Sequence, residues 1–158
     1  SVATLRRICE QAEGVIDFQG FFLQMRLSVL GLSPDHKIPH QESVCSAAVK
    51  ATIDSDIRLI IALTESGYTA RLIAKYRPKC PILAITASET TVRQLGCVCG
   101  VLPMLTPSFQ GTDSVIMKAK KYAKEHGMAA SGDLIVAVHG MQEETPGNSN
   151  IMKVETVP

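Results

Sequence analysis

The stretch "IRLIIALTESGYTARLIAKYRPKCPILAIT", residues 57–86, decides the fold. It begins with a short continuous apolar run bounded by polar residues, which is typical of a strand buried on both faces. A hydroxyl-rich turn follows, then a helical pattern over residues 68–77, then a second apolar run over residues 81–88. Strand, helix and strand in this order predict two parallel strands joined by a right-handed helical crossover.

The same alternation continues downstream. Residues 89–98 are predicted to be helical, and residues 101–106 to form a third strand. The next helix should begin at a capping Thr112 or Asp113 and end on Gly127 in the C′ position. Each crossover adds one more strand to a parallel sheet.

The end of the chain predicts a hairpin. Residues 134–140 form an apolar run, residues 141–150 are polar, and residues 151–158 alternate between apolar and polar. The last strand therefore runs antiparallel at the edge of the sheet. We predict an α/β fold, a three-layer sandwich with a mostly parallel five-stranded sheet.

Two more helices are predicted upstream of this core. The apolar residues of the first recur at helical spacing from the very start: Val2, Leu5, Ile8, Cys9, Ala12, Val15 and Ile16. The second spans Glu42–Asp54, with Gln41 or Ser43 as its cap. Between them, the Gly, Pro, Asp and Ser residues of segment 18–43 predict an irregular crossing. Because a helix pattern begins at once, we expect the chain to be part of a longer one.

The composition is that of one ordinary soluble domain. The 158 residues are 46% apolar and 20% charged, with a formal net charge of +1, which favours neither disorder nor nucleic-acid binding. No apolar stretch approaches the roughly 18–20 residues that span a bilayer, and the N-terminus lacks a signal-peptide pattern. We expect a cytoplasmic protein that binds neither membranes nor nucleic acid.

The cysteines and histidines predict no metal site. The five cysteines lack CxxC spacing, and we interpret them as reduced core thiols. His36 and His40 have HxxxH spacing, but Pro39 between them argues against a helix there. All four histidines are assigned structural or surface roles. The lysines of segment 118–124 are interpreted as a solvated helix face.

The turn after the first strand has the composition of a phosphate site. In parallel sheets, ligands collect at the carboxyl ends of strands, where helix N-termini point their N–H groups outward. Thr64, Ser66 and Thr69 offer hydroxyls there, and Gly67 lets the backbone approach an anion closely. A plain helix cap would use the same residue types. Composition alone therefore leaves both interpretations open.

One residue of the turn opposes an anion. Glu65 places a carboxylate where a phosphate would approach. The repulsion is relieved only if this side chain turns to solvent or pairs with a base such as Arg71 or Lys75.

The quoted stretch resembles the C-terminal domain of pyruvate kinase, in which a Ser/Thr-rich turn, a helix ending in "RYRP" or "KYRP" and a "PILAIT" strand follow one another. "GVLPML", "SGDLIVAVHG" and "GNSNIMKVETVP" stand in the family's order, and "QAEGVIDF" resembles the segment that joins this domain to the catalytic barrel. The resemblance covers nearly the whole chain. "FQGTDSVI", residues 109–116, looks most like the pyruvate kinases of apicomplexan parasites.

The resemblance implies a domain without chemistry of its own. Pyruvate kinase moves a phosphoryl group from phosphoenolpyruvate to ADP in a (β/α)8 barrel that uses magnesium and potassium, and this chain has no room for a barrel of about 250 residues. Domain 1–158 then comprises a connecting helix, 1–17, and an α/β core, 42–158. We assign it no catalytic residue, metal or cofactor. Its expected partners are its own barrel, a sugar-phosphate effector and copies of itself in a homotetramer.

The resemblance also implies effector-binding positions. In the family, the turn holds one phosphate of a sugar phosphate, commonly fructose 1,6-bisphosphate. The matching residues here are Thr64, Ser66, Gly67 and Thr69, with Glu65 and Tyr68 offering backbone N–H groups. The family's effector loop matches residues 140–150, with Gly140, Pro146, Gly147 and Asn148 as the assigned positions.

Two cations that hold a bisphosphate in the family are missing here. Glu65 stands where such members have a basic residue, and counting back from Gly127 puts Val115 where they have an arginine. Charge-assisted hydrogen bonds contribute roughly 1.5–3 kcal/mol, against about 1 kcal/mol for neutral ones. Losing two would weaken binding on the order of a hundredfold. We therefore expect a sugar monophosphate or no effector.

The last strand predicts an assembly surface. Met152, Val154 and Thr156 alternate on one of its faces, and an unpaired edge strand needs protection or a partner. In the family this strand pairs with its twofold mate, which implies a dimer.

Two other functions compete with that of a regulatory domain. The first is a purely structural assembly module with a non-functional effector site, which Glu65 and Val115 favour. The second is an independent nucleotide-binding enzyme, which would need a GxGxxG motif or a Walker lysine that "TESGYTAR" lacks.

Overall fold

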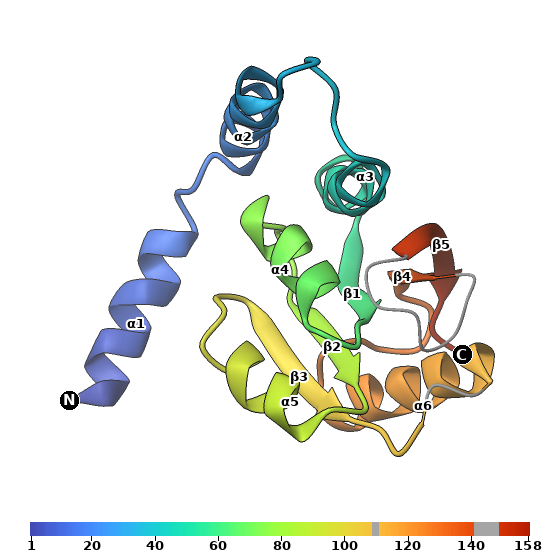
Figure 1. Cartoon of the computed structure of the whole chain (residues 1–158). Coiled ribbons are helices and arrows are strands. Elements are labelled where there is room, and N and C mark those ends of the chain that lie inside the picture. The colour runs from blue at the N-terminus through green and yellow to red at the C-terminus, as the bar shows by residue number, and fades with distance from the viewer. Residues whose placement is uncertain (109–110, 141–148) are drawn as a thin grey trace.

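A five-stranded sheet organises the chain, as the computed structural model shows (Figure 1). The structure describes residues 1–108, 111–140 and 149–158. The helices are α1 (Val2–Glu13), α2 (Phe18–Leu32), α3 (His40–Asp54), α4 (Tyr68–Lys75), α5 (Glu89–Leu95) and α6 (Thr112–Glu125). The strands are β1 (Ile57–Leu63), β2 (Ile82–Thr86), β3 (Val101–Leu105), β4 (Leu134–Gly140) and β5 (Ser149–Thr156).

The strand order is β3-β2-β1-β4-β5, with β1 in the centre. β1 pairs in parallel with β2 and β4, β2 pairs in parallel with β3, and β4 pairs antiparallel with β5. Pro103, which donates no ladder hydrogen bond, is tolerated in β3 because β3 is an edge strand. The predicted fold class, including the antiparallel edge, is confirmed.

Helices cover both faces of the sheet. α3, α4 and α5 lie on one face and α6 on the other (Figure 1). Because side chains alternate along a strand, β1 sends Ile60 and Ala62 into the core beneath α3 and α4, and Leu59 and Ile61 into the core beneath α6. The sheet is therefore the middle layer of a three-layer sandwich.

α2 contradicts the predicted irregular crossing over segment 18–43. Asp17 caps this helix, because its carboxylate accepts a hydrogen bond from the backbone N–H of Gly20 at 2.9 Å. Phe22 anchors the helix with only 2% of its surface exposed. A glycine inside a helix costs about 1 kcal/mol relative to alanine, and the cap and the buried ring outweigh that cost. Only residues 33–39 between α2 and α3 lack helical structure.

Two predicted caps are wrong as well. The predicted cap residues are Gln41 or Ser43 for α3 and Thr112 or Asp113 for α6. In the structure α3 begins after Pro39, whose missing N–H costs nothing at a helix start. α6 begins after Gly111, which has a φ of 74° that glycine adopts without strain.

A buried polar cluster connects α2, α3 and α4. The carboxylate of Glu42, a residue only 7% exposed, accepts a hydrogen bond from the Tyr76 hydroxyl at 2.7 Å and pairs with the ammonium of Lys75. The Tyr76 ring lies 5.6 Å from the ring of Phe22, centroid to centroid. Burial and the neighbouring carboxylate raise the pKa of Tyr76, so its hydroxyl stays a donor at neutral pH. The buried charge thus keeps two donors, which its burial requires.

Lys120 departs from the predicted solvated helix face. It is 6% exposed, and its ammonium lies 2.6 Å from Glu155 and 3.3 Å from the carbonyl oxygen of Thr156. The aliphatic stem is buried beneath α6, and the charge is satisfied by β5. The other lysines of this helix, Lys118, Lys121 and Lys124, are exposed as predicted.

The interpretation of the cysteines as core thiols is half right. All five are free. Cys45 is buried and Cys80 half-buried, and burial raises the pKa of each thiol to about 12, so both stay protonated. Cys9, Cys97 and Cys99 are instead exposed, because they lie on α1 and in the turn after α5 rather than under the sheet.

α1 lies outside both cores. None of its residues is buried, and its apolar side chains Val2, Leu5 and Ile8 are 83%, 64% and 57% exposed. Figure 1 shows it extending away from the sheet. No single helix in the described part of the chain is long and apolar enough to cross a membrane; α1 and α2 meet that test only as a pair bent by 79°.

We predict that Tyr76→Phe lowers the free energy of unfolding by about 1–3 kcal/mol, because the buried Glu42 carboxylate loses one of its two donors. Urea unfolding measures this. Tyr68→Phe is the matched control, since that ring is 47% exposed, and it should change stability by less than about 0.5 kcal/mol. Equal effects of the two substitutions would show that the Glu42 cluster does not stabilise the fold.

Candidate functional site

The turn at residues 64–69 lies where the connections change from one face of the sheet to the other. α4 leaves β1 over one face, whereas α6 enters β4 from the opposite face (Figure 1). Ala62 of β1 pairs with Val138 of β4, so His139 and Gly140, the last residues of β4, lie beside the start of the turn. Ligands of open α/β sheets bind at such switch points.

Neighbouring elements fix the backbone of the turn. The N–H of Thr64 donates to the carbonyl oxygen of Ile85 at 2.9 Å. The carbonyl oxygen of Glu65 accepts two hydrogen bonds, from the hydroxyl of Thr86 at 3.2 Å and from that of Thr91 at 2.9 Å. The turn is therefore held by β2 and α5 before any ligand arrives.

Gly67 starts α4 in the left-handed backbone conformation, in a space where an added Cβ would crowd its neighbours. Its φ is 80°, and a Cβ there would lie 3.1 Å from Leu95 Cδ2 and 3.3 Å from Thr91 Cγ2. As the N-cap residue it has no side chain to cover the first turn of the helix. The N–H groups and the helix dipole at such an end attract anions.

The structure brings all six predicted phosphate-site residues together on this turn, but not all face outward. Ser66 is exposed and Tyr68 is 47% exposed, whereas Thr64 and Thr69 are each 4% exposed. Among the serine and threonine residues of the turn, Ser66 is the exposed one. Thr64 and Thr69 shape the turn from within.

Neither proposed base neutralises Glu65. The guanidinium of Arg71 donates to the side-chain carbonyl of Gln94 at 3.1 Å, and Lys75 pairs with Glu42. The half-exposed Glu65 carboxylate therefore pairs with neither of these two bases beside the candidate site. An anion of high charge is disfavoured there.

The remaining predicted effector positions lie beside the turn, in the core or outside the described residues. Gly140 ends β4 next to the turn, but Pro146, Gly147 and Asn148 lie outside the described residues. Val115 is 2% exposed and packs in the core beneath α6. A cation at that position would have to fit inside the core.

The predicted assembly residues lie on one face of the edge strand β5. Glu155 pairs with Lys120 of α6 and Lys153 lies 3.7 Å from Asp113 of the same helix, so odd-numbered residues face α6. Met152, Val154 and Thr156 share the opposite face, and all three are exposed, Val154 by 51%. Within the described residues β5 pairs with β4 alone.

No metal centre is evident in the described parts of the chain, where no three His, Cys, Asp or Glu side chains converge. His36 lies in the turn before α3 and His40 begins α3, so the two do not share a helix. His139 is the residue that sequence reasoning missed. It is 6% exposed and stands at the carboxyl end of β4, a position that only the strand register reveals.

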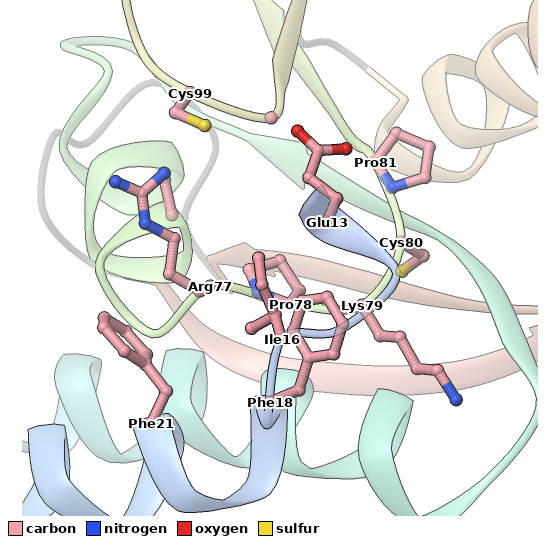
Figure 2. A pocket seen from close by; sticks show the side chains of 12 residues that line it. Glu13, Ile16, Phe18, Phe21, Arg77, Pro78, Lys79, Cys80, Pro81 and Cys99 are labelled. Carbon is pink, nitrogen blue, oxygen red and sulfur yellow. The ribbon is translucent and has the colours of Figure 1, made fainter. Parts of the chain in front are cut away.

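A second hollow lies at the other end of the sheet (Figure 2). Its volume is about 570 Å³, and it separates the α1–α2 connection from the segment that enters β2. Figure 2 shows Ile16, Phe18 and Phe21 from the α1–α2 connection and α2, together with Arg77 and Pro78 from the segment that enters β2. It lies at the amino ends of β2 and β3, and the helix that begins beside it, α2, already has its N-terminus capped by the Asp17 carboxylate. The turn after β1 is therefore the stronger candidate for an anionic ligand.

Comparison with known proteins identifies the family. The family model of the pyruvate kinase alpha/beta domain matches residues 42–155. The chain belongs to the pyruvate kinase family. Its match covers the whole sheet as far as Glu155 in β5 and leaves out α1 and α2.

Individual pyruvate kinases are similar over almost the whole chain. The enzyme of Eimeria tenella is 48% identical over 157 residues, 99% of this chain, and that of Dictyostelium discoideum is 39% identical over 160 residues. The structure of Cryptosporidium parvum pyruvate kinase in complex with ADP superposes with a TM-score of 0.86 at 38% identity over 96% of this chain. The predicted likeness to apicomplexan pyruvate kinases is confirmed. The chain spans 29%, 31% and 29% of the lengths of these three proteins.

We predict that Gly67→Ala destabilises the domain by about 2–3 kcal/mol, because the new methyl group adds overpacking to backbone strain. Gly100→Ala is the matched control: Gly100 has a similar φ of 77°, and a Cβ added there would meet nothing within 4 Å, so strain alone should cost about 1 kcal/mol. Thermal and urea unfolding measure both. A loss as small at Gly67 as at Gly100 would contradict the close packing of the turn.

Proposed function

We propose that this chain is the regulatory and assembly domain of a pyruvate kinase, the enzyme that moves a phosphoryl group from phosphoenolpyruvate to ADP. The family membership supports this, as does the 29% share of the Eimeria relative that the chain spans. The catalytic barrel, with its magnesium and potassium, would correspond to the remainder of such relatives. The exposed apolar residues of α1 (Val2, Leu5 and Ile8) are a suitable surface for contact with that barrel. We place the enzyme in the cytoplasm, where glycolysis takes place.

The regulatory role rests on one observation: the N-terminus of α4, opened by Gly67, lies at the switch point of the sheet. Backbone N–H groups and the Ser66 hydroxyl are suited to one phosphate of a sugar-phosphate effector. Because Thr86 and Thr91 already hold the turn in place, binding requires little ordering of the backbone. A ligand that binds one subunit arrangement better than another would then bias the activity of the barrel.

The charges favour a sugar monophosphate over a bisphosphate. No base offsets the Glu65 carboxylate from within this turn, since Arg71 and Lys75 are engaged with other residues. The first turn of α6 already holds its own carboxylate, that of Asp113, which complements the helix dipole. Among the described residues, neither place offers an unengaged cation for a second phosphate.

Isothermal titration with glucose 6-phosphate and fructose 1,6-bisphosphate tests this proposal. Ser66→Ala should weaken glucose 6-phosphate binding about tenfold or more, the loss expected from one hydrogen bond to a charged group. Ser55→Ala, an exposed serine at the opposite end of β1, is the matched control and should bind as the unchanged protein does.

The same titration can also contradict the proposed effector site. Tight binding of fructose 1,6-bisphosphate by the unchanged protein would overturn the preference for a monophosphate, and Glu65→Lys should raise bisphosphate affinity by about tenfold or more if that preference is correct. If a folded protein binds neither sugar, the alternative of a purely structural assembly module is the better one.

We further propose that β5 pairs with β5 of a second copy about a twofold axis, as part of a homotetramer. The unpaired edge and the exposed Val154 support this. Val154→Asp would bring two like charges close together across the axis and should weaken the dimer at least about tenfold. Sedimentation equilibrium measures the mass. Val2→Asp on α1, 83% exposed, should leave it unchanged, and a monomeric mass for the unchanged protein at high concentration would refute the pairing.

A further inference from the structure

His139 is a buried side chain with one ring nitrogen that makes no hydrogen bond to the described residues. It is 6% exposed, and its Nε2 atom has no hydrogen-bond partner in the described structure. Buried polar atoms are nearly always paired, and an exception calls for an explanation. Its position at the end of β4, beside the turn 64–69, suggests one.

The strand alternation fixes the side of the sheet on which the imidazole lies. Ile135 and Ala137 of β4 pack in the core beneath α6, so His139, two residues further on, faces the same side. Its neighbour across the ladder is Ile151 of β5. The imidazole therefore lies on the α6 side of the switch point, whereas the N-terminus of α4 lies on the other side.

The hydrogen bond of the other ring nitrogen decides the tautomer. Nδ1 of His139 lies 3.1 Å from the carbonyl oxygen of Gly140. A carbonyl oxygen only accepts, so Nδ1 carries the proton and donates it. In the neutral ring, Nε2 is then a bare acceptor. It can bond to a hydroxyl group, which donates, but not to a fully ionised phosphate, which only accepts.

We infer that His139 is a specificity-determining residue of the effector site, whose Nε2 accepts a hydrogen bond from a hydroxyl of the sugar while the turn 64–69 holds the phosphate. This inference rests on the proposed effector site. Ala62 of β1 pairs with Val138 of β4, so the end of β1, where the turn begins, lies one strand spacing of about 4.8 Å from the end of β4. One sugar ring is long enough to bridge that spacing. On the same side of the sheet, Lys153 is paired with Asp113, and a hydroxyl is the group that the bare Nε2 accepts.

Titration with glucose 6-phosphate and with inorganic phosphate tests the role of His139. His139→Phe keeps a ring of similar size without either nitrogen, and it should weaken glucose 6-phosphate binding about fivefold to tenfold while leaving inorganic phosphate unaffected. His139→Gln, whose side-chain oxygen can replace Nε2 as an acceptor, should restore most of the lost affinity. Ser66→Ala, by contrast, should weaken both ligands.

The outcomes separate this inference from the effector site itself. If Ser66→Ala weakens glucose 6-phosphate and His139→Phe does not, the effector site stands and the role of His139 is overturned. If the unchanged protein binds neither ligand, both fall.

A second measurement needs no substitution. In long-range proton–nitrogen NMR spectra of the unchanged protein, glucose 6-phosphate should shift the Nε2 resonance of His139 and leave Nδ1 protonated, whereas inorganic phosphate should not shift Nε2. A Nε2 resonance that does not move at saturating glucose 6-phosphate overturns the inference, even if a variant fails to fold.

Discussion

Burial of β1 on both faces, between two parallel neighbours, is the constraint from which the rest of the structure follows. Its backbone groups are satisfied by a parallel strand on each side and its side chains by helices on both faces, so the chain crosses the sheet repeatedly. β2 and β3 extend the sheet on one side of β1, and β4 and β5 extend it on the other. The crossovers therefore change face between β1 and β4. The candidate site lies at the end of β1, where this change of face takes place.

Much of this architecture can be predicted from the sequence, because it depends on local patterns. The continuous apolar run of β1 predicts a central parallel strand, and the alternation of β5 predicts a half-exposed strand at the edge of the sheet. Neither prediction needs knowledge of a contact. α2 was not predictable in this way. Its glycines lower the local preference for a helix, and the compensation comes from Phe22, which packs against Tyr76 more than fifty positions further along the chain. Tertiary burial outweighs local propensity there.

The candidate site, too, can be predicted from the sequence only in part. The hydroxyls and Gly67 of the turn are visible as a motif, but their directions are not: Thr64 and Thr69 are buried, and Ser66 is the hydroxyl that faces solvent. The engagement of Arg71 with Gln94 arises from packing between α4 and α5. His139 lies far from the turn in the sequence and joins it only through the register of β1 and β4. Side-chain partners of this kind require the three-dimensional structure.

β4 gives the proposed ligand site and the proposed dimer a direct physical connection. This strand pairs with β1 through one edge and with β5 through the other. His139 pairs with Ile151 of β5, and Ile151 is followed by Met152, one of the predicted assembly residues. A ligand bonded to His139 would therefore contact a direct neighbour of the strand that carries the assembly residues. α6 adds a second link, because its Lys120 holds Glu155 and the Thr156 carbonyl of β5. A movement of β4 or α6 on binding would therefore act on β5 through the strand ladder and through the ion pair of Lys120 with Glu155. Coupling between the effector and the subunit arrangement then needs no distant pathway, only the shared strand.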